Sequence, residues 1–310
     1  MADIHRLILE HGVDRAREMA TSKTGRTLVD VAAAMLAQEE DSMGITHAGF
    51  ALTSLPHRSI DKGPEPEYHR KETGRCTLIV QSGRHGDGSL VGVPYGAKAR
   101  MILLYLQTEA LKTNSRQVEL GKSWHSWLKA MGESPGGKTY RLVMEQAQRI
   151  TACSLQFLWE TDASVTRQNA GFVNNSILFK SNPDQRQVAL FQDVIELNES
   201  FYDSLKQHAV PVSEAALRHI SASSTAIDVY IWLAYRLHVL NQATPVRWAA
   251  LRRQFGEHYA KLSHFKPVFL DALALATAVY PEAKVEIADD GIVLHPSRPP
   301  IARREAALIA

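Results

Sequence analysis

The stretch PVRWAALRRQFGEHYAKLSHFKPVFLDALALATAVYPEAKVEIADDGIVLHPS, residues 245–297, decides the predicted fold. Thr244-Pro245 is typical of a helix start and Gly256 of a helix end, so a helix is expected between them. A second helix is expected over residues 263–281, where a proline stops it. Residues 283–297 then alternate around an Asp-Gly turn, which predicts a β-hairpin.

The same order of elements occurs twice along the chain. A helix over residues 224–240, apolar on most sides, precedes the stretch above and is expected to be buried. In the first half we expect helices over 99–113, 123–132 and 138–154, followed by strands over 153–159 and 170–181. Three helices and a hairpin are the order of a winged helix. The predicted fold class is therefore α+β, mainly helical, with two tandem winged-helix domains.

Residues 56–75 have the composition of a linker, with three prolines, many charges and few apolar side chains. We therefore predict an N-terminal arm and linker over residues 1–75 that is loosely attached and partly disordered. The predicted domains follow at 76–205 and 206–301, and residues 302–310 form a C-terminal tail.

Composition narrows the class of protein. The chain has 310 residues, 22% of them charged, and a net charge of +2. It contains no run of eighteen apolar residues and no secretion signal at its start, so no membrane span is predicted. Its two cysteines, Cys76 and Cys153, are far apart and suggest neither a disulfide framework nor a zinc site, which favours a reducing cytoplasm. The histidines show no metal-binding spacing, and no catalytic triad or carboxylate pair stands out, so we predict no metal, no cofactor and no enzyme activity.

The sequence GESPGGKT, residues 132–139, matches the phosphate-loop pattern G-x-x-x-x-G-K-[ST] in full. A phosphate loop needs a buried parallel strand before it and a helix after it. The preceding residues have the spacing of a helix, so we interpret the motif as the turn of a helix-turn-helix. A nucleotide hydrolase that uses Lys138 stays open as an alternative.

Basic residues concentrate in two parts of the chain, which is typical of a surface that binds nucleic acid. Residues 236–266 hold six bases (Arg236, Arg247, Arg252, Arg253, Lys261 and Lys266) against one acid, Glu257. A helix start with free N–H groups suits a DNA phosphate, and a recognition helix reads bases from its N-terminal turns. The predicted DNA-binding residues are Lys138, Thr139, Tyr140, Arg141, Arg149, Arg167, Arg247, Arg252, Arg253, Lys261, Ser263, His264 and Lys266. Arg167 is placed in the turn between the strands of the first wing.

Several segments resemble the plasmid-encoded RepA-type replication initiators. They are VPYGAKARMILLYLQTEALKT and its continuation to residue 155, VPVSEAALRHISASSTAIDVYIWLAYRLHVL, and residues 245–301 with the motifs W-x-x-L-x-x-Q-F-G, F-K-x-x-F-L-x-A-L, V-Y-P-E-A and L-x-P-S-x-P-P. The resemblance covers roughly residues 76 to 301. In the helix after F-K, where the family tends to be basic, this chain has Pro267 and Ala274.

The resemblance implies a bacterial initiator of plasmid replication. It implies binding to double-stranded repeats at a replication origin, opening of the duplex, recruitment of a host initiator and a helicase or its loader, and for some relatives a homodimer. It implies a cytoplasmic protein associated with the plasmid in the nucleoid. A winged-helix transcriptional repressor without initiator activity remains the first alternative.

Overall fold

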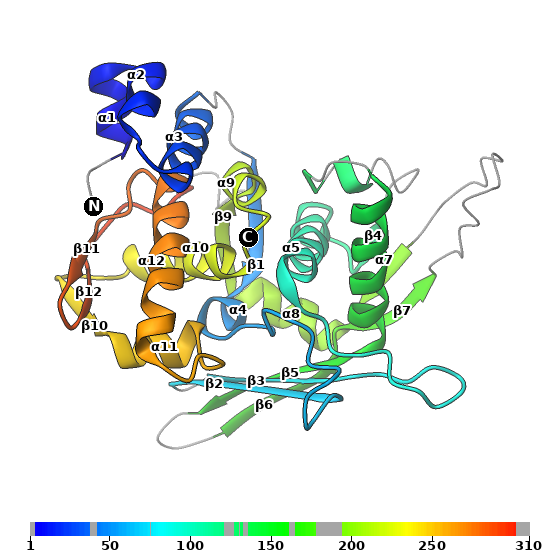
Figure 1. Ribbon diagram of the computed structural model, residues 1–310. Helices are drawn as coiled ribbons and strands as arrows, with labels where there is room; N and C mark the ends of the chain where they lie inside the picture. The colour runs from blue at the N-terminus through cyan, green and yellow to red at the C-terminus, as the bar shows by residue number, and fades with distance from the viewer. Residues whose placement is uncertain are drawn as a thin grey trace. The chain divides into compact units, whose positions relative to one another are not determined.

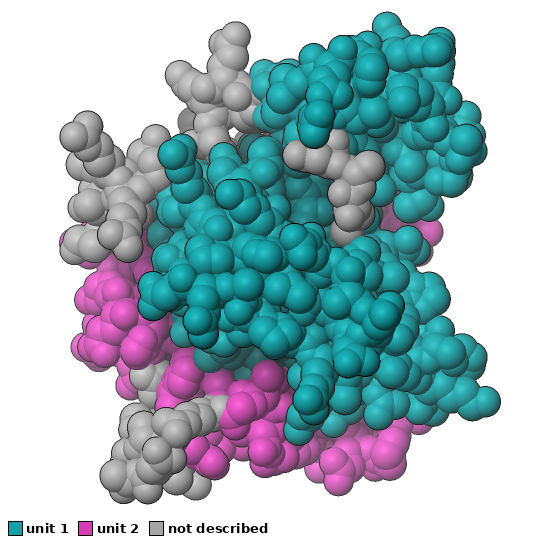
Figure 2. All heavy atoms as spheres, turned by 90° about the vertical axis from the view of Figure 1, so that its left-hand side faces the viewer, with its two compact units in different colours: residues 1–44, 50–54, 210–310 teal, residues 45–49, 55–209 magenta. Residues whose placement is uncertain are grey.

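The computed structural model describes residues 4–37, 42–74, 76–120, 127–129, 131–132, 136–160, 165–177 and 194–301 (Figure 1). The chain forms two compact units, coloured separately in Figure 2. Unit 1 comprises residues 1–44, 50–54 and 210–310, and unit 2 comprises residues 45–49 and 55–209. The chain passes between the units within or beside β1 (Met43–His47), α4 (Ala48–Leu52) and β9 (Ala209–Ser213).

The N-terminal part of unit 1 consists of α1 (Ile4–His11), α2 (Val13–Met19) and α3 (Lys23–Leu36). The hydroxyl of Ser22 caps α3 by accepting a hydrogen bond from the Gly25 N–H. Ile8, Val29 and further apolar side chains of these helices pack with Ala278 in one hydrophobic cluster. His5 Nε2 also lies 2.8 Å from the Ala278 carbonyl oxygen.

These contacts correct the prediction of a loosely attached arm. The amphipathic faces of α1 and α3 find an apolar partner near residue 278, more than 240 positions along the chain. The later part of the predicted arm, residues 68–73, is a strand of unit 2. The units therefore divide the chain elsewhere than at the predicted boundaries of residues 75 and 205.

The C-terminal part of unit 1 contains the three helices and the hairpin that the sequence predicts, with one added strand, β10, and one added short helix, α9. The elements are α9 (Glu214–His219), α10 (Ser224–Leu237), β10 (Thr244–Arg247), α11 (Trp248–Phe255), α12 (Leu262–Ala278), β11 (Val285–Ala288) and β12 (Gly291–Leu294). The sheet has the order β10-β12-β11, and both pairings are antiparallel. Residues 244–247 were expected to open α11 but form β10, because they pair with residues 291–294.

Unit 2 holds two antiparallel sheets and three helices of eight or more residues in its described part. The elements are β2 (Tyr68–Thr73), β3 (Cys76–Gln81), α5 (Gly96–Lys112), β4 (Gln117–Glu119), α7 (Gly137–Ala152), β5 (Ser154–Glu160), β6 (Val165–Gly171), β7 (Val173–Ile177), β8 (Val194–Leu197) and α8 (Glu199–Gln207). One sheet has the order β2-β3-β5-β6 and the other β4-β8-β7. The mixed α and β composition with small sheets is as predicted.

The two three-stranded sheets share one topology. In each of these sheets the strand that comes first along the chain, β4 or β10, pairs with the one that comes last, β8 or β12. The remaining strand, β7 or β11, pairs with the other edge of that last strand. In each unit helical residues lie between the first strand and the second, including α7 in unit 2 and α11 and α12 in unit 1. The two sheets therefore share a strand order, although in unit 2 the strands β5 and β6 lie between α7 and β7 along the chain.

The first hairpin lies in a different place from the prediction. Residues 153–159 were expected to pair with residues 170–181 as the first wing. Instead β5 pairs with β6, which begins at residue 165, and on its other side with β3. The next strand, β7, belongs to the other sheet of unit 2, where it pairs with β8. The predicted wing was wrong because residues 165–171 take the edge of β5 that residues 170–181 were expected to fill, and β7 finds its partner in β8.

The core of unit 2 contains a buried histidine. The His47 ring stacks on Phe157 with ring centres 4.7 Å apart, and its Nε2 lies 2.8 Å from Ser204 Oγ. Its Nδ1 accepts a hydrogen bond of 3.0 Å from the Gly49 N–H, so the neutral ring satisfies both nitrogens. Burial, with a smaller effect of nearby His208, lowers the pKa of His47 from 6.5 to about 3.

Candidate nucleic-acid interface

A close turn joins α11 to α12 in unit 1. Gly256 ends α11, and a Cβ atom at this position would lie only 2.1 Å from Cδ2 of Phe265, which is 1% exposed in α12. Arg252 Nη1 donates hydrogen bonds to the carbonyl oxygens of Tyr259 at 3.3 Å and Ala260 at 2.9 Å. Two residues therefore fix the turn. Gly256 leaves room for the Phe265 ring, and the Arg252 guanidinium binds the carbonyl oxygens of Tyr259 and Ala260.

Trp248 connects α11 to the hairpin. Its indole Nε1–H donates to the Asp289 carbonyl at 2.9 Å, and its backbone N–H donates to the Asp290 carbonyl at 2.9 Å. Lys266 Nζ lies 4.8 Å from the centre of the same ring, within the range of a cation–π contact. The buried tryptophan therefore fixes three things relative to one another: the start of α11, the tip of the hairpin and the Lys266 ammonium.

The helices α11 and α12 begin at basic residues. Arg247 and Lys261 occupy the N-cap positions, and neither side chain makes a capping hydrogen bond. The helices α9 and α10 of the same unit begin at Ser213 and Ser223, whose hydroxyls accept such a bond. The first-turn N–H groups of α11 and α12 therefore receive no side-chain cap and have a cation beside them, which suits an anion such as a phosphate.

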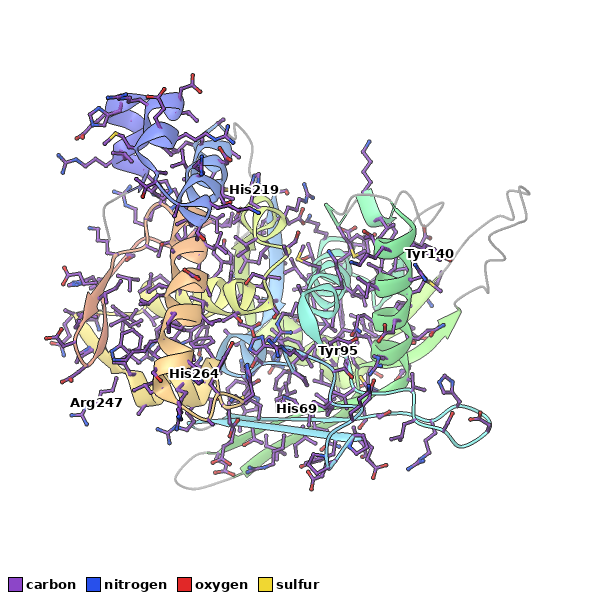
Figure 3. The ribbon with its side chains drawn as sticks, in the orientation of Figure 1. His69, Tyr95, Tyr140, His219, Arg247 and His264 are labelled. Carbon is purple, nitrogen blue, oxygen red and sulfur yellow. The ribbon has the colours of Figure 1, made fainter. Side chains whose placement is uncertain are left out.

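The predicted contact residues of unit 1 surround this turn. Arg247, Arg253, Lys261, Ser263 and His264 are exposed. Figure 3 shows Arg247 at the end of β10 and His264 in the first turn of α12. Arg252 and Lys266 are half-buried and occupied with the contacts described above. The residues predicted to read or hold DNA in this unit therefore come together at one helix-turn-helix.

In unit 2 the predicted contacts lie at the start of α7. This helix begins at Gly137 after an N-cap glycine that makes no side-chain capping bond. Lys138 and Arg141 are exposed, and Thr139 and Tyr140 are half-buried, all in the first two turns. Residues 127–129 are helical, as predicted, and residues 133–135 of GESPGGKT lie outside the described residues. The described part before α7 therefore holds a helical turn where a phosphate loop needs a strand.

Comparison with known proteins identifies the family of this chain. The model of the family described as plasmid encoded RepA protein matches residues 93–251, about half of the chain. The chain belongs to the plasmid RepA family. A search of curated proteins found no match.

Among solved structures, domains 2 and 3 of RctB share the fold of this RepA-family chain. The first of two RctB structures has 10% sequence identity and a TM-score of 0.53 and covers 83% of this chain and 97% of its own. The second, RctB residues 155–483, has 11% identity and a TM-score of 0.48 and covers 79% of this chain and 95% of its own.

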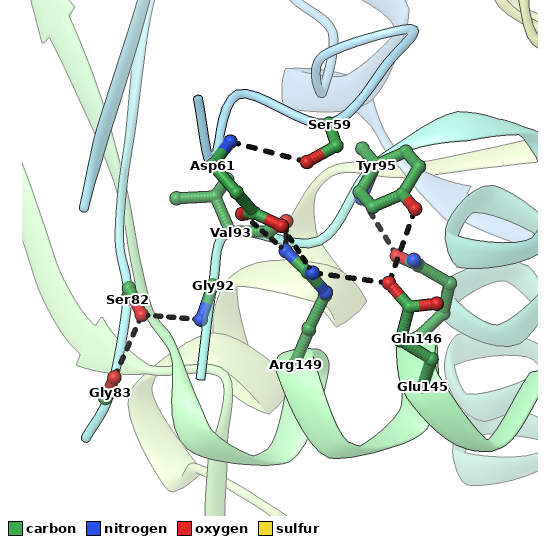
Figure 4. A network of polar contacts seen from close by, with 10 residues as sticks. All are labelled: Ser59, Asp61, Ser82, Gly83, Gly92, Val93, Tyr95, Glu145, Gln146 and Arg149. Atoms are coloured by element: carbon green, nitrogen blue, oxygen red, sulfur yellow. Dashed lines mark hydrogen bonds and ion pairs between the residues drawn. The ribbon is translucent and has the colours of Figure 1, made fainter. Parts of the chain in front are cut away.

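Arg149, one of the predicted contacts, is a structural residue of this RepA-family chain. It is 7% exposed, and its guanidinium donates to both carboxylate oxygens of Asp61 at 2.8 and 2.6 Å (Figure 4). It also lies 3.1 Å from a carboxylate oxygen of Glu145 and donates to the Val93 carbonyl. The prediction is corrected because two carboxylates and a carbonyl oxygen hold this cation, and its side chain is buried within unit 2.

The same network fixes α7 to the loops around it. The hydrogen bond from Arg149 lowers the pKa of Asp61, as expected for a carboxylate beside a guanidinium. Gln146, one turn earlier in α7, accepts a hydrogen bond from the Tyr95 N–H at 2.8 Å. The second half of α7 is thus held by side-chain contacts, while Lys138 and Arg141 in its first two turns are exposed.

Arg167 also differs from its predicted place. It lies within β6, opposite Leu158 of β5, and not in a turn between two wing strands. The strand that was expected to follow that turn begins earlier, at Val165, which moves Arg167 into the four-stranded sheet. Among the described residues there is no group of three metal-ligating side chains, and no helix that is long and apolar enough to cross a membrane.

Proposed function

We propose that this RepA-family chain is a sequence-specific DNA-binding initiator of plasmid replication that performs no chemistry of its own. The observation that carries the proposal is the helix-turn-helix of α11 and α12, with both helices starting at a cation that makes no capping bond. A family match over residues 93–251 supports the same function independently. An initiator of this kind acts in the cytoplasm, where the plasmid replicates.

Each unit is proposed to act as a winged helix. In unit 1, α10, α11 and α12 are the three helices, β10-β12-β11 is the sheet, and α12 is the recognition helix. In unit 2, α5 and α7 correspond to the first and third helices, and β4-β8-β7 is the sheet. The shared strand order supports this assignment. Two such units on one chain suit a site that extends over successive turns of the duplex.

The cations are proposed to divide by role. Arg247 and Lys261 in unit 1, and Lys138 and Arg141 in unit 2, are exposed near helix starts and suit backbone phosphates. Arg253, exposed in the last turn of α11, suits a phosphate as well. Ser263 and His264 lie in the first turn of α12, the part of a recognition helix that faces base edges. Binding at the origin repeats would then distort the duplex and present it to host initiator and helicase, with a homodimer as an alternative state of the chain.

Footprinting tests this function. The full-length protein is expected to protect the repeats of its plasmid's origin, and Lys261→Ala is expected to weaken this protection through the loss of one phosphate contact. Lys23→Ala, which removes an exposed lysine from α3 in the same unit, serves as the matched control and is expected to behave as the wild type. Protection of the plasmid's promoters but not of its origin would favour the repressor instead, and no protection of either would contradict DNA binding.

A further inference from the structure

The surface of α12 carries an exposed strip of unusual composition. His264, Pro267, Val268 and Asp271 follow the spacing i, i+3, i+4, i+7, which places them side by side on a helix, and all four are exposed. Such spacing commonly marks a buried stripe, yet Val268 is 40% exposed. The opposite face of α12, with Phe265, Phe269 and Leu273, is buried in unit 1.

No lysine or arginine belongs to this strip. The basic side chain of this helix, Lys266, is directed to the Trp248 ring on the other flank, and Lys261 precedes the helix. Asp271 adds a carboxylate, which phosphates would repel. A strip with an acid and two apolar side chains is therefore unsuited to a phosphate backbone, although cations flank it.

Base edges in the major groove match the strip better. The C5-methyl group of thymine is the apolar feature of that groove, and the N4 amino group of cytosine is a donor that a carboxylate accepts. The two Val268 methyl groups and the Pro267 ring provide an apolar contact, while Asp271 lies one turn further along α12. We propose that Val268 is a specificity-determining residue that contacts a thymine methyl group in the target DNA. The inference rests on the proposed function, since it takes α12 as the recognition helix.

The experiment begins with the target site. Full-length wild-type protein is used to select duplexes from a random 20-base-pair library, and each thymine of the selected site is then replaced in turn by deoxyuridine. This change removes one methyl group and leaves every hydrogen-bonding group in place. At one thymine the affinity is expected to fall roughly fourfold, the factor that corresponds to about 0.8 kcal/mol for a buried CH₂-sized group.

Val268→Ala provides the second arm of a double-mutant cycle. The variant is expected to bind the thymine duplex severalfold more weakly and to be indifferent to deoxyuridine at the position where the wild type responds. Val239→Ala is the matched control because it removes the same atoms from a valine that is 56% exposed and lies outside α12. It is expected to keep the wild-type response, and thermal melting verifies that both variants are folded.

The outcomes separate the inference from the function on which it rests. If Val268→Ala keeps the full response to deoxyuridine at every thymine, Val268 does not contact a methyl group, while sequence-specific binding stands. If the wild type selects a site that contains no responsive thymine, the inference is also overturned. If the wild type enriches no sequence at all, the proposed function itself fails.

Discussion

The turn between α11 and α12 provides a sharp test of how the helix-turn-helix is built. Replacing Gly256 by alanine places a methyl group 2.1 Å from Cδ2 and 2.5 Å from Cε2 of Phe265, whereas ordinary contacts begin at about 3.4 Å. The ring must therefore move by more than about 1 Å, and it is packed against Phe269 at a ring-centre distance of 5.3 Å. Gly256 has a negative φ, so the cost is one of packing and not of backbone conformation.

Overpacking in a well-packed core costs about 1–3 kcal/mol. Because the new methyl group meets the rigid Phe265 ring, which packs against the rigid Phe269 ring, we expect Gly256→Ala to cost about 3 kcal/mol. Urea denaturation measures this change in the free energy of unfolding, and the melting temperature should fall by roughly 6–12 °C. Gly137→Ala is the matched control, since no atom of the described residues lies within 4 Å of a Cβ there. It is expected to leave stability unchanged or to raise it slightly.

A second substitution checks the cause. In Gly256→Ala/Phe265→Leu the smaller side chain leaves room for the new methyl group, so the two effects should fall short of additivity by at least about 1 kcal/mol. If Gly256→Ala costs no more than Gly137→Ala, or if the two effects of the double variant simply add, then the proximity of Gly256 and Phe265 does not fix the turn.

Three further predictions concern stability. Because the pKa of His47 is lowered to about 3, unfolding takes up a proton below pH 6.5, so the free energy of unfolding should fall by about 2 kcal/mol from pH 7.5 to 5. Urea titrations across this pH range should show a smaller fall for His47→Phe than for the wild type. An equal fall in both proteins would refute this prediction. The pKa of Asp61 is lowered beside Arg149, so its contribution is complete above about pH 4 and disappears as the pH falls further. Asp61→Asn should therefore be less stable than the wild type at pH 7, with the difference shrinking in acid. Arg252→Ala should lower stability by about 1 kcal/mol through its two lost hydrogen bonds, whereas Arg247→Ala, an exposed change, should cost less than about 0.5 kcal/mol in the same denaturation assay.

The sequence predicts best those helices and turns that are determined by residues close together in the chain. The helices α10, α11 and α12 follow from their apolar spacing, and the ends of α11 and α12 follow from Gly256 and Pro281. The hairpin after α12 follows from alternation around Asp290. These signals act over a few residues, so they survive without knowledge of the rest of the chain.

Pairing between distant segments is what the sequence does not reveal. Residues 244–247 become a strand because they meet residues 291–294, and β5 joins a four-stranded sheet because β3 is available to it. Propensity is a weak guide in such cases because the partner decides the outcome.

The candidate site shows the same limit. Arg149 resembles any other base of a helical surface in sequence, but its partner Asp61 is 88 positions away. Arg252 likewise resembled a phosphate contact, and its carbonyl partners in the turn appear only once α12 is in place. The type and spacing of charged residues thus predicted where basic side chains cluster. Burial and pairing with other residues decide which of these side chains are available to contact DNA.

The salt dependence of DNA binding tests the central claim most directly, because each phosphate contact contributes a fixed slope to the plot of log K against log salt. Wild type, Lys138→Ala, Lys261→Ala and the double variant would be titrated with duplex DNA of the plasmid's origin, with Lys23→Ala as the control. The account predicts that each single change reduces the slope by about 1 and that the double change reduces it by about 2. Slopes identical to that of the wild type in both single variants would show that the helix starts of the two units do not hold the DNA backbone.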